Sequence, residues 1–266
     1  MGDEPTLVHP TAVVDPRAAL GAGVSVGPLA VVGPGVEIGD GCRIDARATL
    51  LGPLRLGRRC VVGCGAVLGA EPQARSHRGE PTWLEIGDDT VIREQVTAHR
   101  GTAASGGVTR VGSRCLLMVG VHVAHDCCVG DDVTFANLVT LAGHVRVGDR
   151  CSFAGLAAVA PFVEIGRAVY LAGGSCVERN LPPFVIAGGH RARVRAPNSI
   201  GLRRAGAPAA SIRAVERAFR RIWTRGPTIA AGARAARAEL GDDPWVAELL
   251  EALDRGFEPR RVAVRP

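Results

Sequence analysis

The feature that most constrains this chain is a six-residue period in the positions of its aliphatic side chains. Such a residue recurs at every sixth position from Val8 to Leu68, and Gly often follows it, as in "IGDGCR" and "VGCGAV". Neither the helical period of about 3.6 nor the strand period of about 2 explains a sustained six. A parallel β-helix does, because each hexapeptide then supplies one strand and one corner. Three hexapeptides complete one triangular coil.

Two interruptions of the period predict two external loops. The phase returns at Ile86, and after a slip of one residue it resumes at Val111 and continues to Val177. The segments near 70–85 and 101–109 contain turn residues and few apolar ones. Loops that leave a rigid scaffold commonly carry function, which makes these two candidates for a functional role.

The composition fits a narrow interior made of small side chains. Aromatic residues are only 4% of the chain, and Gly counts 35. The fifth position of the hexapeptide is a small inward slot, where cysteines behave as buried hydrophobes rather than as a disulfide or zinc-cysteine framework. Five cysteines occupy this slot: Cys42, Cys60, Cys115, Cys127 and Cys151.

A helical pattern replaces the period in the last part of the chain. Ala209–Arg225, Thr228–Leu240 and Pro244–Gly256 are predicted helices, with Ser211 as the N-cap of the first. The tail from Phe257 is expected to fray. We therefore expect a β-helix over residues 1–190 and a helical domain over residues 191–266.

The charge excludes some classes of function. All 32 basic residues are Arg and the net charge is +6, which most simply reflects genome composition but also suits an acidic partner or an anionic substrate. Nucleic acid is not an expected partner, since no basic run is interleaved with aromatics. The start "MGDEPTLVHP" lacks a signal-peptide pattern, and no apolar run approaches the roughly 18 residues of a membrane span. These features predict a cytoplasmic protein.

The stretch "VGVHVAHDCCVG" concentrates polar residues that the repeat does not require. A coil of three hexapeptides places His125 and His144 on one face, about 4.8 Å apart along the axis. His122 lies at the preceding corner and His99 about one coil earlier, so four histidines line one groove. A neutral imidazole is a suitable general base near pH 7. Asp126 orients the His125 ring only if the chain turns a corner there, because adjacent strand residues point to opposite faces.

Two other functions remain open from the residues alone. His122, His125 and His144 are a possible zinc set of the kind found in β-helical carbonic anhydrases, although the spacing and the helical tail differ from that family. A catalytically inactive binding scaffold is the other alternative. The presence of His125, Asp126 and Gly143 together argues against a scaffold.

Five stretches together resemble one family: "RGEPTWLEIGD", "IREQVTAHRGT", "LLMVGVHVAHDCCVG", "TLAGHVRVGD" and "PPFVIAGG". The chain looks like the acyl-carrier-protein-dependent UDP-N-acetylglucosamine O-acyltransferases of lipid A biosynthesis, over nearly its whole length. The resemblance implies an all-β left-handed parallel β-helix followed by a small helical domain. It also implies a homotrimer with sites between subunits, an acyl carrier protein as donor, and no metal or other cofactor.

The resemblance assigns roles to individual residues. His125 would remove the proton from the sugar 3-hydroxyl, and the backbone N–H of Gly143 would stabilise the oxyanion. Gly173 would lie in the acyl groove, where glycine suggests that a longer chain is admitted. The remaining implied substrate-binding positions are Gln73, His99, His122, His144, Asn198 and Arg204.

The chain departs from the family's usual residues at positions that serve acceptor recognition. An acid and a lysine of the first loop are replaced by Ala74 and Ser76, and a His-Gln pair by Ala160-Pro161. Ile200 stands for an expected Glu, and Ala205 for a second basic residue. These departures keep an alternative acceptor open, such as a 3-amino nucleotide sugar.

The basic residues before and on the first predicted long helix suggest a docking site for an acidic carrier protein. These residues are Arg203, Arg204, Arg213, Arg217, Arg220 and Arg221.

Overall fold

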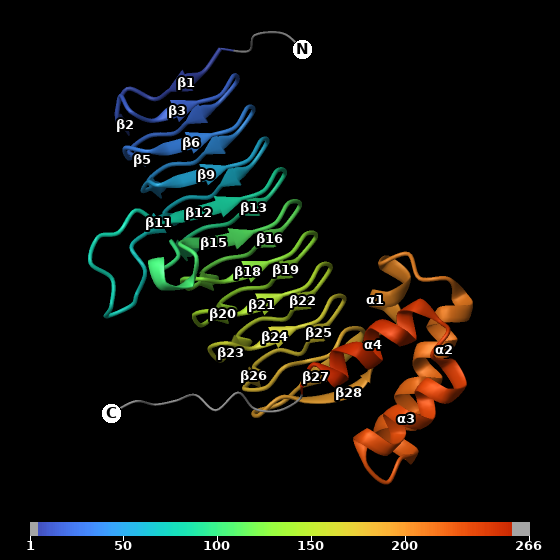
Figure 1. The fold of residues 1–266 in the computed structure, drawn as a ribbon. Helices are drawn as coiled ribbons and strands as arrows, with labels where there is room; N and C mark the ends of the chain where they lie inside the picture. Colours follow the sequence, from blue (N-terminus) through green and yellow to red (C-terminus); the bar gives the residue numbers. More distant parts are fainter. Residues whose placement is uncertain (1–4, 257–266) are drawn as a thin grey trace.

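Three sheets of short strands wind around one axis in the computed structural model, which describes residues 5–256 (Figure 1). The first sheet contains β1 (Leu7–Val8), β4 (Ser25–Val26), β7 (Arg43–Ile44), β10 (Val61–Val62), β13 (Val91–Ile92), β16 (Leu116–Leu117), β19 (Thr134–Phe135), β22 (Ser152–Phe153), β25 (Tyr170–Leu171), β27 (Val185–Gly188) and β28 (Arg193–Pro197). The second contains β2 (Val13–Val14), β5 (Val31–Val32), β8 (Thr49–Leu50), β11 (Val67–Ala70), β14 (Thr97–His99), β17 (His122–Val123), β20 (Thr140–Leu141), β23 (Ala158–Val159) and β26 (Cys176–Val177). The third contains β3 (Ala19–Leu20), β6 (Val36–Ile38), β9 (Leu54–Leu56), β12 (Trp83–Ile86), β15 (Val108–Val111), β18 (Cys128–Val129), β21 (Arg146–Val147) and β24 (Glu164–Ile165).

The predicted coil length is confirmed by the strand register. Leu7 pairs with Ser25 and Ser25 with Arg43, so consecutive coils are offset by three hexapeptides. Every pairing inside the coils is parallel, and only β28 runs antiparallel to its neighbour β27. The fold is the left-handed parallel β-helix that the repeat and the family resemblance predict.

The inward positions predicted from the period form one continuous core. Aliphatic side chains from Val26 to Val177 stack in it, and the five slot cysteines are buried there too. Val8 is exposed because no coil covers its end of the stack. Burial raises the pKa of the Cys127 and Cys151 thiols to about 12, so these groups stay protonated at neutral pH and act as small apolar side chains.

Both predicted loops are insertions into the coil of three hexapeptides. Thr97 pairs with Val67 in the coil before it and with His122 in the coil after it, and both steps are longer than the regular one. The first insertion lies between β11 and β12, and the second between β14 and β15, where it contains a short 3-10 turn, Ala103–Ser105. The second adds seven residues, one hexapeptide plus one, which explains the slip of one in the sequence pattern. Both loops leave the same edge of the β-helix, opposite the helical domain in the view of Figure 1.

Corners between the sheets repeat one backbone geometry. Asp126, His144 and Phe162 occupy equivalent positions of three consecutive coils and have φ values of 63°, 64° and 64°. This left-handed conformation is uncommon for residues other than Gly and turns the chain sharply between two short strands. The fold therefore stacks the side chains of these three residues above one another.

The described C-terminal part, up to residue 256, contains four α-helices: α1 (Ser199–Arg204), α2 (Ala209–Phe219), α3 (Ile229–Leu240) and α4 (Pro244–Asp254). A π-helical turn, Arg220–Arg225, continues α2, so the predicted first long helix is present over its full length. The short helix α1 was not expected from the sequence. The predicted fraying from Phe257 lies outside the described residues. No helix within residues 5–256 has the length and apolar character needed to cross a bilayer.

One expectation about the helices is wrong. Pro208, not Ser211, is the N-cap residue of α2. Ser211 is buried inside the helix and donates a hydrogen bond to Asp243 Oδ2 at 2.7 Å, while Asp243 Oδ1 caps the N-terminus of α4. The hydroxyl therefore joins two helices, a long-range contact that the local pattern around Ser211 does not contain.

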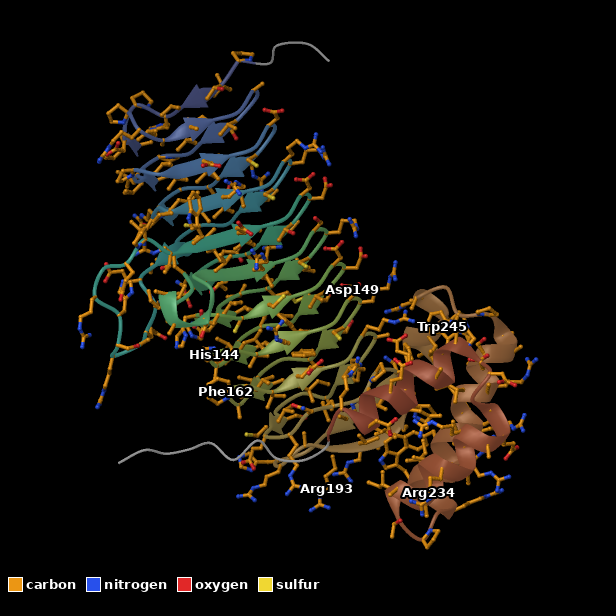
Figure 2. The ribbon with its side chains drawn as sticks, viewed as in Figure 1. His144, Asp149, Phe162, Arg193, Arg234 and Trp245 are labelled. Atoms are coloured by element: carbon orange, nitrogen blue, oxygen red, sulfur yellow. The ribbon has the colours of Figure 1, made fainter. Side chains whose placement is uncertain are left out.

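The helices pack on the last coils of the β-helix through Arg167. Its guanidinium makes two short hydrogen bonds with the carboxylate of Glu248 on α4, both at 2.7 Å. It also lies 4.2 Å from the ring centroid of Trp245 and 4.8 Å from that of Phe184. Trp245, labelled in Figure 2, lies in the first turn of α4.

Candidate active site

The predicted histidines gather at one corner of the β-helix, between the second and third sheets. We call this the histidine corner and define it by residues 124–127 and the equivalent residues 142–145 of the next coil. His125 and His144 meet edge to face, with ring centroids 5.2 Å apart, and His99 and His122 meet in the same way at 5.4 Å. The four side chains come from consecutive coils, as the register requires.

His125 is oriented by the carboxylate that follows it in the sequence. Its Nδ1 lies 2.7 Å from Asp126 Oδ2, and the Asp126 side chain is only 2% exposed. The left-handed backbone at Asp126 provides the corner that this pairing needs. Because a carboxylate only accepts, Nδ1 donates the proton, and the lone pair of the neutral ring is then on Nε2.

The second loop holds the other side of the Asp126 carboxylate. The backbone N–H of Thr102 donates to Oδ1 at 2.7 Å, and its hydroxyl donates to Oδ2 at 2.8 Å. The backbone N–H of Asp126 itself donates to Thr109 Oγ1 at 2.7 Å. Thr102 and Thr109 are both buried, so these hydrogen bonds are shielded from water. Together with His125 Nδ1, the two groups of Thr102 give the carboxylate three donors.

Gly143 lies directly against the His125 ring. A Cβ atom at position 143 would be 2.7 Å from Cε1 and 2.9 Å from Nε2, closer than real contacts permit. Only glycine therefore leaves room for the imidazole in this position. The backbone N–H of Gly143 has no acceptor among the described residues, so it is available to a bound group beside Nε2.

His144 is supported by an aromatic ring from the next coil. It stacks on Phe162 with ring centroids 4.3 Å apart and planes at 7° (Figure 2). Its Nε2 lies 3.6 Å from Asp126 Oδ2, which is too long for a hydrogen bond. Burial lowers the pKa of His144, which the charge of Asp126 opposes and that of His125 reinforces.

The other two histidines are also held through Nδ1. His99 Nδ1 donates to the backbone carbonyl of Glu71 in the first loop at 2.7 Å. His122 Nδ1 is hydrogen-bonded to Thr97 Oγ1 at 2.8 Å. Burial lowers the pKa of His122, and the charges on His99 and His125 lower it further. Across residues 5–256, Nε2 of His99, His122 and His125 has no hydrogen-bond partner.

Within one chain, the geometry does not join the three histidines of the zinc hypothesis, which places the metal between subunits. The residues whose ligand atoms lie within 4.8 Å of one another are His125, Asp126 and His144, without His122. In that group the Asp126 oxygens already accept from Thr102 and His125. The donor set therefore fits proton transfer better than metal ligation.

The remaining predicted residues lie elsewhere in the chain. Gln73 is exposed on the first loop, two residues after Glu71. Gly173 is at the corner between the first and second sheets, not at the histidine corner. Asn198 is buried as the N-cap of α1, where its amide donates to Ala168 O and its Oδ1 accepts from Gly201 N. Arg204 is exposed at the end of the same helix.

Sequence reasoning missed Thr102, Thr109 and Phe162. The sequence contains a weak indication for Thr102 and Thr109, because both are polar residues at the borders of an insertion that interrupts the repeat close to the histidines. Phe162 occupies the position one coil after His144, and an aromatic residue at such a corner stands out in a chain with few aromatics.

Comparison with known proteins identifies the family. The chain is 43% identical over 249 residues to the acyl-[acyl-carrier-protein]–UDP-N-acetylglucosamine O-acyltransferase of Halorhodospira halophila, covering 94% of this chain and 96% of the relative. It belongs to this O-acyltransferase family. The enzyme of the same name from Alkalilimnicola ehrlichii is 43% identical over 255 residues, covering 95% of this chain and 99% of the relative.

Family models and solved structures agree with this membership. The second domain of the UDP-N-acetylglucosamine O-acyltransferases matches residues 181–261, and the bacterial transferase hexapeptide model matches residues 35–70. A crystal structure of the UDP-N-acetylglucosamine acyltransferase from Bacteroides fragilis superimposes with a TM-score of 0.87 at 34% identity, covering 91% of this chain and 95% of that one. As a member of the O-acyltransferase family, the chain is an acyltransferase.

Proposed function

We propose that this acyltransferase moves an acyl chain from acyl carrier protein to the 3-hydroxyl of UDP-N-acetylglucosamine, the first step of lipid A biosynthesis, in the cytoplasm and without a metal. The observation that carries the proposal is the pairing of a base and an oxyanion donor. Nε2 of His125 is free while Nδ1 is held by Asp126, and the free N–H of Gly143 lies beside the same ring.

The chemistry follows from this arrangement. Nε2 of His125 takes the proton of the acceptor hydroxyl as its oxygen forms a bond to the thioester carbonyl carbon. Asp126 stabilises the imidazolium that results. The carbonyl oxygen becomes an oxyanion and accepts from the Gly143 N–H. The C–S bond then breaks, the carbonyl re-forms, and the imidazolium returns its proton to the departing thiolate of the carrier.

We infer that His99, His122 and His144 bind the acceptor. Burial lowers the pKa of His122 and of His144, so these two rings are mostly neutral at pH 7, and a neutral ring both donates and accepts hydrogen bonds. We add Gln73 to this set, because it lies two residues after Glu71 in the first loop, whose carbonyl holds His99. A sugar carries several hydroxyl groups, which suits such a set of uncharged polar contacts.

A homotrimer is part of the proposal. Gly173, Asn198 and Arg204 lie away from the histidine corner of their own chain, at another corner and in the helical domain. An assembly in which one subunit supplies the histidine corner and its neighbour supplies these residues would give all of them access to one substrate. We therefore propose that Gly173 borders the acyl chain and that Asn198 and Arg204 act on the substrate of the adjacent subunit.

The ion pairs of the helical domain narrow the proposed docking site for acyl carrier protein. Arg217 and Arg221 share one carboxylate, that of Glu239 on α3, which offsets one of their two positive charges. Arg203, Arg204, Arg213 and Arg220 have no acidic partner within residues 5–256. We propose that these four arginines receive the acidic carrier.

Turnover with defined substrates tests the function. Purified protein with acyl-loaded carrier protein and UDP-N-acetylglucosamine should form the 3-O-acyl product. His125→Ala should lower kcat by about 100-fold or more, the range that a positioned general base contributes, while retaining the assembly and melting temperature. Because Ala74, Ser76, Pro161, Ile200 and Ala205 depart from the family's usual residues, the 3-amino analogue belongs in the same assay. If the enzyme acylates only the 3-amino analogue, the proposed acceptor is wrong and the analogue takes its place.

A further inference from the structure

We propose that Thr102 is a positioning residue for the general base, acting through Asp126, and that the seven-residue insertion is part of the catalytic device. The inference rests on the proposed function for its kinetic readout. The insertion lies one coil before the histidine corner, and its first residues bring Thr102 onto the Asp126 carboxylate.

The hydrogen-bond count shows why Asp126 needs an external partner. One oxygen, Oδ2, accepts both from His125 Nδ1 at 2.7 Å and from the Thr102 hydroxyl at 2.8 Å. The other, Oδ1, accepts from the Thr102 backbone at 2.7 Å. Without the Thr102 hydroxyl, Oδ2 would be held by His125 alone among the side chains of residues 5–256, and the backbone N–H of residue 102 would still hold Oδ1. The oxygen that faces the imidazole would then be held less firmly, and the direction of the ring would be less well fixed.

The loop is itself anchored, so the position of Thr102 is well defined. The Thr102 carbonyl accepts from Ser105 N and Gly107 N, which closes the loop on itself. The loop is also tied to β12, because Gly101 N donates to Trp83 O and Trp83 N donates to Gly107 O. Thr109, at the far end, accepts from the Asp126 backbone. The two ends of the insertion therefore hold one residue of the next coil between them.

Two variants separate the hydroxyl from the space it occupies. Thr102→Val removes the donor at nearly constant volume, and Thr102→Ser keeps it. We expect Thr102→Val to lower kcat by about 10- to 100-fold, part of the factor supplied by a positioned general base, with a small change in KM. Thr102→Ser should retain kcat within about threefold, since the same hydrogen bond can form.

The pH profile and a double variant test whether the effect passes through Asp126. With one donor removed, more of the carboxylate charge faces His125 and favours its protonated form, so the acid limb of kcat/KM should move to higher pH. In an Asp126→Asn background, adding Thr102→Val should cause no further loss, because residues that act in series are not additive.

Thr90 offers a matched structural control. It is a fully buried threonine elsewhere in the β-helix, whose hydroxyl donates to Gly112 O and accepts from Cys115 N. Thr90→Val should lower the melting temperature without moving the pH profile. Wild-type kcat and pH profile in Thr102→Val, or an equal loss in Thr102→Ser, would overturn the proposal.

A readout that does not depend on turnover separates this inference from the proposed function. In 15N-histidine NMR, the His125 signal, assigned with His125→Gln, reports the tautomer and titration of the ring. Thr102→Val should move the titration to higher pH and leave the proton of the neutral ring on Nδ1, whereas Thr102→Ser should change neither. If the wild type fails to acylate UDP-N-acetylglucosamine, the proposed function has failed. An unchanged His125 signal in Thr102→Val would separately refute the role of Thr102.

Discussion

The ring of His125 covers Gly143 so closely that a methyl group at position 143 would lie 2.7 Å from Cε1. The clash involves a side chain held at its other end by Asp126, so the ring has little freedom to move aside. Gly143 thus allows the His125 ring to lie directly against the backbone and places its own free N–H beside the ring.

Gly143→Ala should therefore displace the base. We expect kcat to fall by about 100-fold, comparable to the loss of an oxyanion donor, with the melting temperature nearly unchanged. Gly33→Ala is a suitable control, since the nearest atom to its Cβ would be Leu50 O at 3.3 Å and the residue lies several coils away. Near-wild-type kcat in Gly143→Ala would show that the ring accommodates the methyl group.

The stack of Phe162 on His144 leads to a prediction about acceptor binding. Phe162→Ala removes an aromatic contact worth about 0.5–1.5 kcal/mol, so His144 should sample other orientations. We expect KM for the acceptor to rise about 3- to 10-fold, with a smaller change in kcat. Leu29→Ala, another exposed corner residue with a positive φ, controls for the backbone geometry. A fall in kcat alone would place Phe162 in the chemical step instead.

The lowered pKa values of His122 and His144 predict a loss of stability in acid. Each group binds a proton more weakly in the folded than in the unfolded state, where the ordinary value is 6.5. Their contribution is complete above pH 6.5 and is lost as the pH falls toward the folded-state values. The melting temperature should thus drop between about pH 7.5 and 5.5, and less steeply in His122→Gln. If the melting temperature of His122→Gln falls with pH as steeply as that of the wild type, groups other than His122 cause the acid sensitivity.

Arg167 should hold the helical domain on the β-helix. Arg167→Met keeps most of the stem but removes the paired hydrogen bonds to Glu248 and the cation–π contacts, which should cost about 1–3 kcal/mol. Urea unfolding followed by the fluorescence of the tryptophans should show earlier loss of the helices. Arg237→Met, which removes an exposed pair with Asp254, should cost less than about 1 kcal/mol. Equal losses in the two variants would contradict the docking role.

Reversal of unpaired charge should weaken the binding of the donor alone. In the double variant Arg213→Glu/Arg220→Glu, KM for acyl carrier protein should rise about tenfold at low salt, and the difference should shrink as the ionic strength increases. KM for the acceptor should stay constant. Arg47→Glu, exposed at the far end of the β-helix, is the matched control. If KM for acyl carrier protein is the same in the double variant and the wild type, the carrier does not dock at these arginines.

The β-helix was predictable because a repeated steric requirement leaves a direct trace in the sequence. Leu141 has to be aliphatic for the same reason as Val123 and Val159, and counting coil by coil then places His125 beside His144. The slip at the second loop was visible as a change of phase, although its length of seven residues became meaningful only with the strand register.

Contacts that depend on distant segments had no such trace. Nothing near Ser211 indicates that its hydroxyl reaches Asp243, and the hydrogen bond from Thr102 to Asp126 joins distant residues through a loop without regular structure. The structural role of Asn198, whose side chain caps α1 and donates to Ala168 O, also depends on a segment far away in the sequence. Helix α1 escaped notice because a helix of 6 residues is too short to show a helical period.

Both loops leave and re-enter the coil at the same edge, and this has a consequence for how such an enzyme can change. An addition or deletion there changes the length of the loop without altering the rise from one coil to the next, so the spacing between His125 and His144 stays the same. The first loop can therefore vary in length and sequence while His125 and His144 keep their spacing. The second loop is less free, because Thr102 also holds the carboxylate that orients His125.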